Sequence, residues 1–259
     1  MRVKHEIKKI VFPVFKRVSS LVLNNKRARY AYLKVSTFFV DHGISPLLST
    51  SSASMRGRWL KQGTQDSLVD PKTYLDEDKS TEELFKEVLP YLSKEGAILE
   101  IGCNVGRSLN YLHKQGYKNL TGIEIGSEAV KLMEASFPEM HHATKIITGD
   151  AAEEIKKFPT GGFDLVFCHS VLVSIPPKAN HIFKEMARVS NKFVLILESE
   201  GTCTAYPRNF KKMFERQGLK MIVSKIFTEA CSSLPIPFKE EHIYKNNTIR
   251  LFVKNKSQK

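Results

Sequence analysis

The stretch AILEIGCNVGR, residues 97–107, determines how the rest of the chain is interpreted. It begins with the apolar run of a buried strand, passes through Gly102 and Gly106, and leads directly into a helical pattern over residues 108–115. Two glycines four residues apart let the backbone turn sharply and let a ligand approach closely. The N–H groups at the start of the next helix favour a negatively charged ligand group. The stretch therefore predicts a strand, a ligand-binding turn and a helix in succession.

Apolar runs and helical patterns alternate along the chain from residue 82 onward. The expected strands cover residues 97–101, 120–124, 145–150, 163–169, 192–198, 219–226 and 248–253. This alternation predicts an α/β fold with a mostly parallel sheet and helices on both faces. Such sheets bind ligands at the carboxyl ends of their strands. The polar residues expected at that edge are Glu100, Glu124, Asp150, His169 and Glu198.

Composition limits the class of protein. The chain has 259 residues, 42% of them hydrophobic, enough for one large domain with a real core. Its four cysteines are far apart, which argues against a zinc knuckle or a disulfide framework and fits a reducing compartment. No apolar run reaches the ~18 residues that a membrane-spanning helix needs, and no secretion signal is recognisable. We therefore expect a cytoplasmic location.

The positive charge is concentrated at the N-terminus. The net charge is +13; residues 1–40 carry ten Lys or Arg against one acid, Glu6, so +9 lies there and +4 in the remainder. Residues 5–23 have a helical apolar stripe with the basic residues mostly off it, interrupted at Pro13. Such an arm suits an anionic membrane surface, a nucleic acid, or packing on the domain with a solvated basic face. A peripheral membrane position is thus one expectation.

Two regions are expected. Residues 1–79 would form the basic helical arm with a cap or lid segment, and residues 80–259 the catalytic domain. Residues 41–80 look irregular, because a stretch rich in Ser and Thr is broken by Pro46. They also contain the only tryptophan, Trp59. An aromatic and basic segment ahead of a nucleotide-like site often covers it; a surface loop anchored by Trp59 is the alternative.

Four segments, ILEIGCNVGRS, LTGIEIG, IITGDAAE and FDLVFCHSVL, resemble in order and spacing the motifs of class I S-adenosylmethionine (SAM)-dependent methyltransferases. The resemblance covers roughly residues 82–226, with 248–253 as the seventh strand. It implies a Rossmann-like, seven-stranded sheet and SAM as cofactor. In the implied set, Glu124 binds the ribose, Glu100 and the glycine turn frame the methionine part, and Asp150 flanks the adenine. The implied cofactor-binding residues are Glu100, Gly102, Cys103, Asn104, Gly106, Glu124, Ile125, Asp150, Ala151 and His169.

The sequence departs from the family on the acceptor side. Many members that act on small molecules have a histidine after the fourth strand where this chain has Ser174. Residues 174–177, SIPP, also do not match the Asp/Asn-Pro-Pro-aromatic motif of methyltransferases that act on amino groups. Roles on the acceptor side therefore cannot be carried over from the family.

His169 is the candidate catalytic base. Methyl transfer from a sulfonium depends mainly on positioning, and a base is needed only when the acceptor must lose a proton. His169 ends a strand at the pocket floor, and its ordinary pKa suits that role; a cofactor-side or structural contact is the alternative. His141 and His142, in a connecting segment after Pro138, are expected at the surface, with metal ligation as the alternative; no metal site is expected.

The sequence thus predicts a SAM-dependent methyltransferase acting on a small-molecule, saccharide or lipid-linked acceptor, at oxygen. One alternative is an RNA methyltransferase whose basic arm contacts phosphates; the nearly balanced charge of residues 41–259 speaks against it. Another is a SAM-binding protein without catalysis.

Overall fold

A computed structural model describes residues 26–42, 44, 52–63, 70–76, 79–199, 206–227 and 247–254. The strands are β1 Ile98–Ile101, β2 Leu120–Glu124, β3 Lys145–Thr148, β4 Phe163–His169, β5 Ser190–Ser199, β6 Leu219–Phe227 and β7 Asn247–Lys254. The α-helices are α2 Lys26–Asp41, α3 Ser52–Leu60, α4 Lys79–Phe85, α5 Arg107–Lys114, α6 Ser127–Ser136, α7 Pro138–Ala143, α8 Ala151–Glu154, α9 His181–Val189 and α10 Phe210–Glu215. Short 3-10 turns are η1 Pro71–Tyr74, η2 Leu89–Tyr91, η3 Ile155–Lys157, η4 Leu172–Ser174 and η5 Pro177–Ala179.

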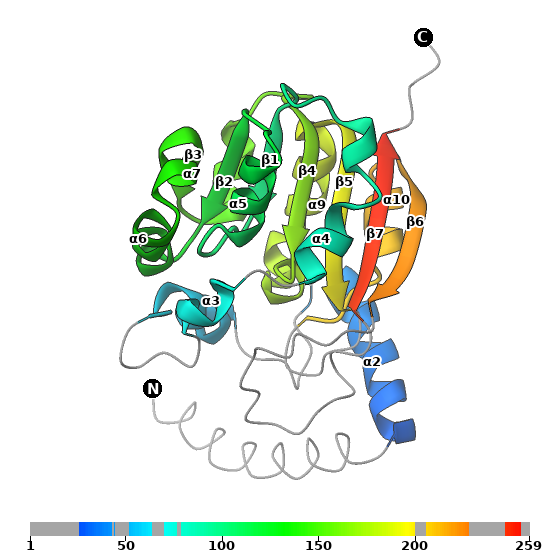
Figure 1. Ribbon diagram of the computed structural model, residues 1–259. Helices are drawn as coiled ribbons and strands as arrows, with labels where there is room; N and C mark the ends of the chain where they lie inside the picture. Colours follow the sequence, from blue (N-terminus) through cyan, green and yellow to red (C-terminus); the bar gives the residue numbers. More distant parts are fainter. Residues whose placement is uncertain are drawn as a thin grey trace.

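The strands form one seven-stranded sheet in the order β3-β2-β1-β4-β5-β7-β6 (Figure 1). Strands β1 to β5 pair in parallel, and β7 runs antiparallel to both β5 and β6. The strand order reverses between β1 and β4, which is where open α/β sheets bind ligands. The predicted fold class, a Rossmann-like and mostly parallel seven-stranded sheet, is confirmed.

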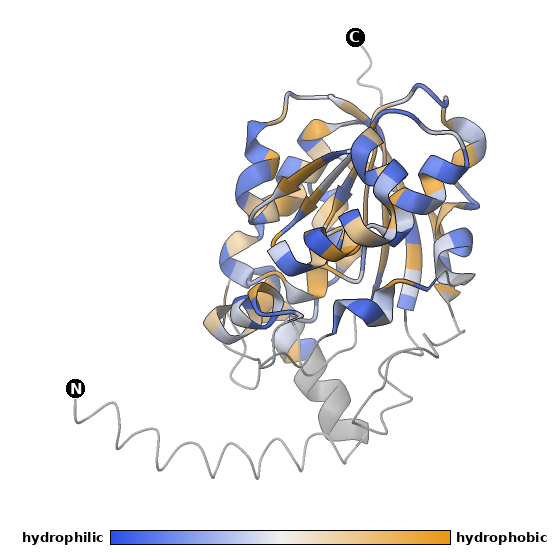
Figure 2. Cartoon of the chain, turned by 60° about the vertical axis from the view of Figure 1, so that its left-hand side comes forward, coloured by the Kyte–Doolittle hydropathy of each residue, from blue (hydrophilic) through white to orange (hydrophobic). Residues whose placement is uncertain are grey.

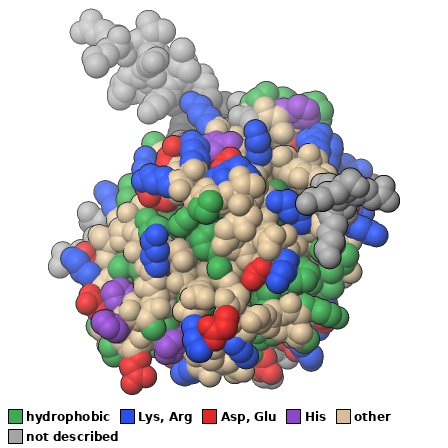
Figure 3. Space-filling model, turned by 90° about the horizontal axis from the view of Figure 1, so that it is seen from above, with side chains coloured by type: hydrophobic (Ala, Val, Ile, Leu, Met, Phe, Trp, Pro, Cys, Tyr) green, Lys and Arg blue, Asp and Glu red, His purple; other side chains and the backbone are tan. Residues whose placement is uncertain are grey.

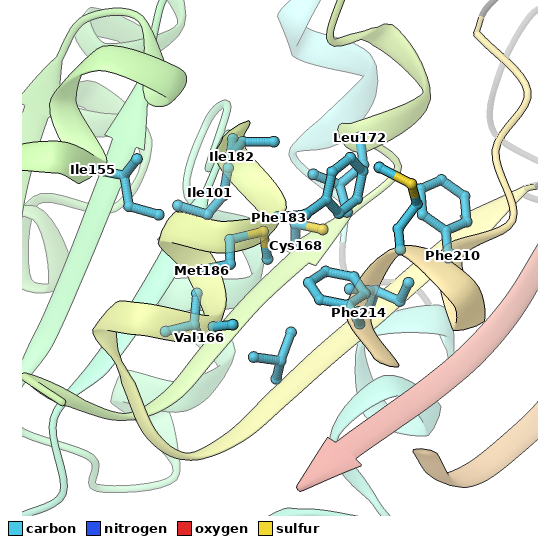
Figure 4. Close-up of a cluster of buried hydrophobic side chains, with 14 of the residues drawn as sticks. Ile101, Ile155, Val166, Cys168, Leu172, Ile182, Phe183, Met186, Phe210 and Phe214 are labelled. Atoms are coloured by element: carbon cyan, nitrogen blue, oxygen red, sulfur yellow. The ribbon is translucent and has the colours of Figure 1, made fainter. Parts of the chain in front are cut away.

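The central strands are apolar on both faces because helices cover both faces. Side chains alternate along each strand, so that Leu99 and Ile101 of β1 join one core cluster and Ile98 joins the other. Figure 2 shows the apolar strands enclosed by helices with hydrophilic outer surfaces. The first cluster lies under α9 and α10, where Phe183 and Phe214 pack edge to face (Figure 4). The second lies under α4, α5, α6 and α7.

Two expectations about local structure need correction. The region 41–80 is not irregular throughout: it contains α3 and η1, and Trp59 lies in α3 rather than in a surface loop. The segment after Pro138 is helix α7, because proline is favoured in the first turn.

The predicted division into residues 1–79 and 80–259 stays a prediction, and the basic helix over 5–23 lies outside the described residues. Two side chains from the first region are nevertheless buried in the core of the second. Val40 of α2 and Met55 of α3 are 0% and 2% exposed and belong to the cluster under α9 and α10. None of the helices within the described ranges is long and apolar enough to cross a membrane.

The amino-terminal edge of the sheet faces the viewer in Figure 3. On this face Lys and Arg side chains are interspersed with Asp and Glu side chains. A continuous basic track, which would suit a nucleic-acid backbone, is not visible on this face.

Candidate active site

The carboxyl edge of the sheet brings together the predicted strand-end residues. Glu100 lies beside Gly122 of β2 and Phe167 of β4, Glu124 is the last residue of β2, and His169 is the last residue of β4. Asp150 follows β3 and caps helix α8. Because these strands are parallel, the groups come from distant parts of the sequence to a single edge, as the alternation of strands and helices predicts.

The turn from Gly102 to Gly106 needs its glycines for two physical reasons. Both have φ in the left-handed region, +70° and +77°, where other residues are strained. A Cβ at Gly102 would also lie 2.6 Å from Cγ2 of Val171, and one at Gly106 would lie 2.8 Å from Cε of Met140. Both neighbours are protein side chains, so these glycines shape the turn rather than admit the ligand themselves.

Most N–H groups of this turn donate hydrogen bonds to other groups of the chain. The N–H groups of Gly102 and Cys103 donate to the Ile123 carbonyl, that of Gly106 donates to Cys103, and that of Asn104 donates to Oε2 of Glu124. The N–H groups left for a ligand are therefore those of the first turn of α5, since a helix cannot pair them internally.

Glu124 is 4% exposed and held by three donors from the chain. Its Oε1 accepts from Gln62 Nε2 at 2.9 Å and from the Gly126 N–H at 2.7 Å, and its Oε2 accepts from the Asn104 N–H at 2.9 Å. Burial raises the pKa of this carboxyl, while these hydrogen bonds and one from the Ile125 backbone oppose the rise. The carboxylate is therefore held in one orientation at the carboxyl edge of the sheet.

Glu100 is 3% exposed, and burial raises its pKa to about 8, opposed by nearby Arg107 and a hydrogen bond from Ser108. Its Oε2 is buried and has no hydrogen-bond partner within the described part of the chain. A buried acceptor without a donor costs about 1–3 kcal/mol. Glu100 is therefore positioned to gain from a cationic or donor group of a ligand.

Two predicted cofactor residues offer the ligand only limited contact. The Cys103 side chain is buried in the core, where its Sγ occupies the space beside Gly122, and burial raises the pKa of its thiol well above the ordinary value. Cys103 can therefore meet a ligand only through its backbone. Ile125 lies half-buried between Glu124 and Gly126.

Asp150 has one carboxylate oxygen available beside the site. Its Oδ1 accepts from the Ala152 N–H at 3.1 Å and so caps α8, with Ala151 as the first helical residue. Its Oδ2 lies 3.5 Å from Nη2 of Arg56, which is on α3. The carboxylate of Asp150 therefore caps α8 with one oxygen and meets a cation from α3 with the other.

The segment after His169 is fixed from two sides. Ser170 has a φ of +58°, and the N–H groups of Val171 and Leu172 both donate to Oε1 of Glu198 at 2.7 Å. Buried Arg208 donates to the carbonyls of Leu172 and Ile175. Glu198 is fully buried and its pKa is raised to about 7 by that burial. Glu198 therefore stands at the expected edge of the sheet, and its carboxylate orders the loop that follows His169.

The sequence did not predict the contacts made by α3, or those that hold the loop after β4. Gln62, Trp59, Arg208 and Asn180 stand outside any motif, and only tertiary contacts bring them to the edge. Arg208 bonds Oδ1 of Asn180 at 3.0 Å, and Nδ2 of Asn180 donates to the Val40 carbonyl at 2.7 Å. The lone tryptophan next to basic residues was the one sequence signal, and it indicated a cover without identifying its contacts.

Four buried polar atoms near this edge have no hydrogen-bond partner in the described ranges: Glu100 Oε2, Asn104 Oδ1, Gln62 Oε1 and Trp59 Nε1. The set holds three acceptors and one donor. SAM carries the matching groups, an ammonium, a carboxylate, a ribose diol and an adenine amine. The residues present therefore fit SAM. No group of three His, Cys, Asp or Glu that could hold a metal occurs among the described residues.

The comparisons with known proteins agree with this geometry. The sequence model of the family described as a methyltransferase domain matches residues 99–193, from β1 into β5. No curated protein matches the chain in sequence. The match over residues 99–193 identifies a methyltransferase domain in this part of the chain, and the fold supports the class I SAM-dependent type with SAM as cofactor. The predicted family and cofactor are confirmed.

Solved structures share the fold at low identity. One is the [4+2]-cyclase SpnF, with a TM-score of 0.56 and 13% identity over 68% of this chain and 80% of that one. Another is magnesium protoporphyrin IX methyltransferase from Synechocystis PCC 6803, with bound SAM. It has a TM-score of 0.52 and 16% identity, over 77% of this chain and 89% of that one. A third is geranyl diphosphate C-methyltransferase from Streptomyces coelicolor A3(2), in complex with S-adenosyl-L-homocysteine. It has a TM-score of 0.54 and 10% identity, over 67% of this chain and 76% of that one. Their substrates are mixed, so the likeness defines the fold and not the acceptor.

Proposed function

We propose that this chain transfers the methyl group of SAM to an oxygen atom of a small-molecule, saccharide or lipid-linked acceptor. The observation that carries the cofactor half is Glu100, whose buried and unpaired oxygen suits the ammonium of the methionine part. Glu124 would accept from the ribose diol and Oδ2 of Asp150 from the adenine amine, while the first turn of α5 would meet the carboxylate.

His169 is the proposed base. SAM, when bound, supplies an electrophilic methyl group on a positively charged sulfur. An attacking hydroxyl forms the new O–CH₃ bond as the S–CH₃ bond breaks, its electron pair stays on sulfur, and the hydroxyl proton must leave. His169 ends β4 at the carboxyl edge, and the loop that follows it is held by Glu198 and Arg208. A histidine in a fixed position can take that proton.

Helix α2 supports an apolar or lipid-linked acceptor. Its inward face carries Ser36 and Val40, which are buried, and Val40 is tied through Asn180 to Arg208 beside the post-β4 loop. Its outward face exposes Val35 and Phe38 at 56% and 60%. Exposed apolar side chains on a helix within a basic N-terminal region suit an anionic membrane surface. A peripheral position at a membrane is part of this proposal.

The test is a screen for transfer of a radiolabelled methyl group from SAM to lipid, saccharide and RNA fractions. The proposal predicts label in the lipid or saccharide fraction, held in a methyl ether that is stable to alkali. Replacing His169 by Ala should lower turnover by about 10²–10⁴-fold without abolishing SAM binding. His142→Ala, an exposed histidine on α7, is the matched control.

Other outcomes of this screen would contradict the proposal. Label in RNA alone would support the nucleic-acid alternative. SAM binding without transfer to any fraction would support a protein that uses the fold for another purpose, as the cyclase among the structural neighbours shows to be possible. Unchanged turnover in His169→Ala would remove the assigned base.

A further inference from the structure

Helix α3 and the turn after it contact both acids of the cofactor edge. Gln62 reaches Glu124, with Nε2 2.9 Å from Oε1, and Arg56 reaches Asp150 at 3.5 Å. Figure 1 shows α3 beneath the carboxyl ends of β1 and β2. One segment from outside the strand-and-helix domain thus engages the two carboxylates expected to bind the ribose and the adenine.

The place of Gln62 is specifically shaped. Its side chain is 0% exposed. A Cβ at Gly126 would overlap the amide group of Gln62, so the missing side chain at Gly126 makes room for it. Met55, 2% exposed, and Trp59 pack α3 on the core cluster under α9 and α10. Apolar contacts thus hold α3 in place, while Gln62 makes the polar contact with Glu124.

Gln62 occupies a site on Glu124 that the ribose needs. A carboxylate has about four lone-pair positions, and at least three donors of the chain already bind the Glu124 carboxylate. A ribose diol donates two further hydrogen bonds, so one existing donor must leave. The Asn104 and Gly126 donors are backbone N–H groups fixed by the glycine turn and the start of α6. Gln62 is the donor that can leave, by rotation of its side chain.

Gln62 also has an unmet hydrogen-bonding need in this arrangement. Its Oε1 is buried without a partner among the described residues, and so is Nε1 of neighbouring Trp59. Each such atom costs about 1–3 kcal/mol. The contact of α3 with Glu124 is therefore incomplete, which favours its replacement by a ligand that satisfies more of these atoms.

We propose that Gln62 is a latch on the cofactor site: it holds α3 closed on Glu124 in the free protein, and the ribose of SAM displaces it. This inference rests on the proposed function, because it takes SAM as the ligand of Glu124. The ion pair of Arg56 with Asp150 is a second, weaker contact between α3 and this edge of the sheet. It is weaker because both side chains are partly exposed, at 56% and 35%.

The chain supplies its own probe of α3, because Trp59 is its only tryptophan. Stopped-flow fluorescence of Trp59 during SAM binding is compared in the wild type, in Gln62→Leu, which keeps most of the side-chain volume, and in Gln62→Asn, which is too short to reach Glu124. Gln115→Leu, at an exposed site after α5, is the control. Thermal melting without SAM first shows that each variant folds.

Displacement of the latch predicts a saturable change in Trp59 emission on SAM binding. It also predicts about three- to tenfold faster association in both Gln62 variants and an unchanged rate in the control, since a tenfold change corresponds to one modest hydrogen bond. The latch alone would be overturned if calorimetry shows SAM binding while Trp59 emission does not change. In that outcome both Gln62 variants also associate with SAM at the wild-type rate. An absence of any SAM binding by the wild type would instead overturn the proposed function.

Discussion

Buried carboxyl groups dominate the chemistry of this molecule at the scale of single residues. Glu100, Glu124 and Glu198 are each less than 5% exposed, and burial raises the pKa of all three. The donors differ: Glu124 and Glu198 are paired through both oxygens, whereas Oε2 of Glu100 is unpaired. Sequence reasoning identified the acids at the strand ends but could not separate Glu198, which orders a loop, from the two cofactor candidates, because donors from distant segments make that distinction.

Glu100 should make the stability of the ligand-free protein fall with increasing pH. Its folded pKa of about 8 lies above the ordinary value of 4.5, so between these pH values the unfolded chain loses the proton first and unfolding becomes more favourable. Glu100→Gln should therefore gain stability relative to the wild type as pH rises from about 5 to about 8. Urea unfolding across this range measures the difference, with exposed Glu134→Gln as control. A difference that does not depend on pH would contradict the assignment.

Gly102 should tolerate a methyl group less well than another glycine with the same backbone conformation. Gly102 and Gly116 have φ of +70° and +84°, so alanine is strained at both. At Gly116 the added Cβ meets open space, whereas at Gly102 it meets the Val171 side chain. Gly102→Ala should therefore cost about 1–3 kcal/mol more than Gly116→Ala in free energy of unfolding. Equal losses in urea unfolding would show that the contact with Val171 is unimportant.

At the scale of elements, the seven strands and most domain helices could be predicted because buried strands and glycine turns leave local signals. The strands at 120–124 and 163–169 have the expected ends, Leu120–Glu124 and Phe163–His169. Helix α3 could not be predicted, because its short sequence, SASMRGRWL, contains Ser52, Ser54 and Gly57, which are weaker helix formers. Burial of Met55 and Trp59 against the core stabilises it instead. Its contacts with Glu124 and Asp150 were invisible for the same reason.

The outward face of α2 should bind anionic vesicles. Its exposed apolar residues are Val35, Phe38 and Phe39, and replacing all three by serine removes the apolar part of the attraction while leaving the charges. The triple variant should lose most flotation with phosphatidylserine vesicles, whereas serine at exposed Ile222 and Ile226 of β6 should not change it. Wild-type flotation of the triple variant, or equal loss in the β6 variant, would contradict a membrane role for α2.

At the scale of the whole molecule, the cofactor half and the acceptor half differ in how far the sequence predicts them. The residues of the cofactor half lie in contiguous sequence motifs. The sequence therefore predicts the family, the fold and the sheet edge at which Glu100, Glu124 and Asp150 lie. The proposed acceptor half consists of α2, the post-β4 loop and Arg208, which meet only in the folded chain. Ser174 replaces the family's histidine there, and the solved structures of this fold have mixed activities. The acceptor is therefore a matter for experiment.

Calorimetric titration with SAM tests the central claim most directly, that the carboxyl edge around Glu124 is a SAM site. The wild type should bind one SAM per chain, and Glu124→Gln should bind at least about tenfold more weakly, because a hydrogen bond to a charged group contributes about 1.5–3 kcal/mol. Glu134→Gln, exposed on α6, should bind as the wild type does. A wild-type Kd weaker than about 1 mM, or equal affinity in Glu124→Gln and the wild type, would contradict it.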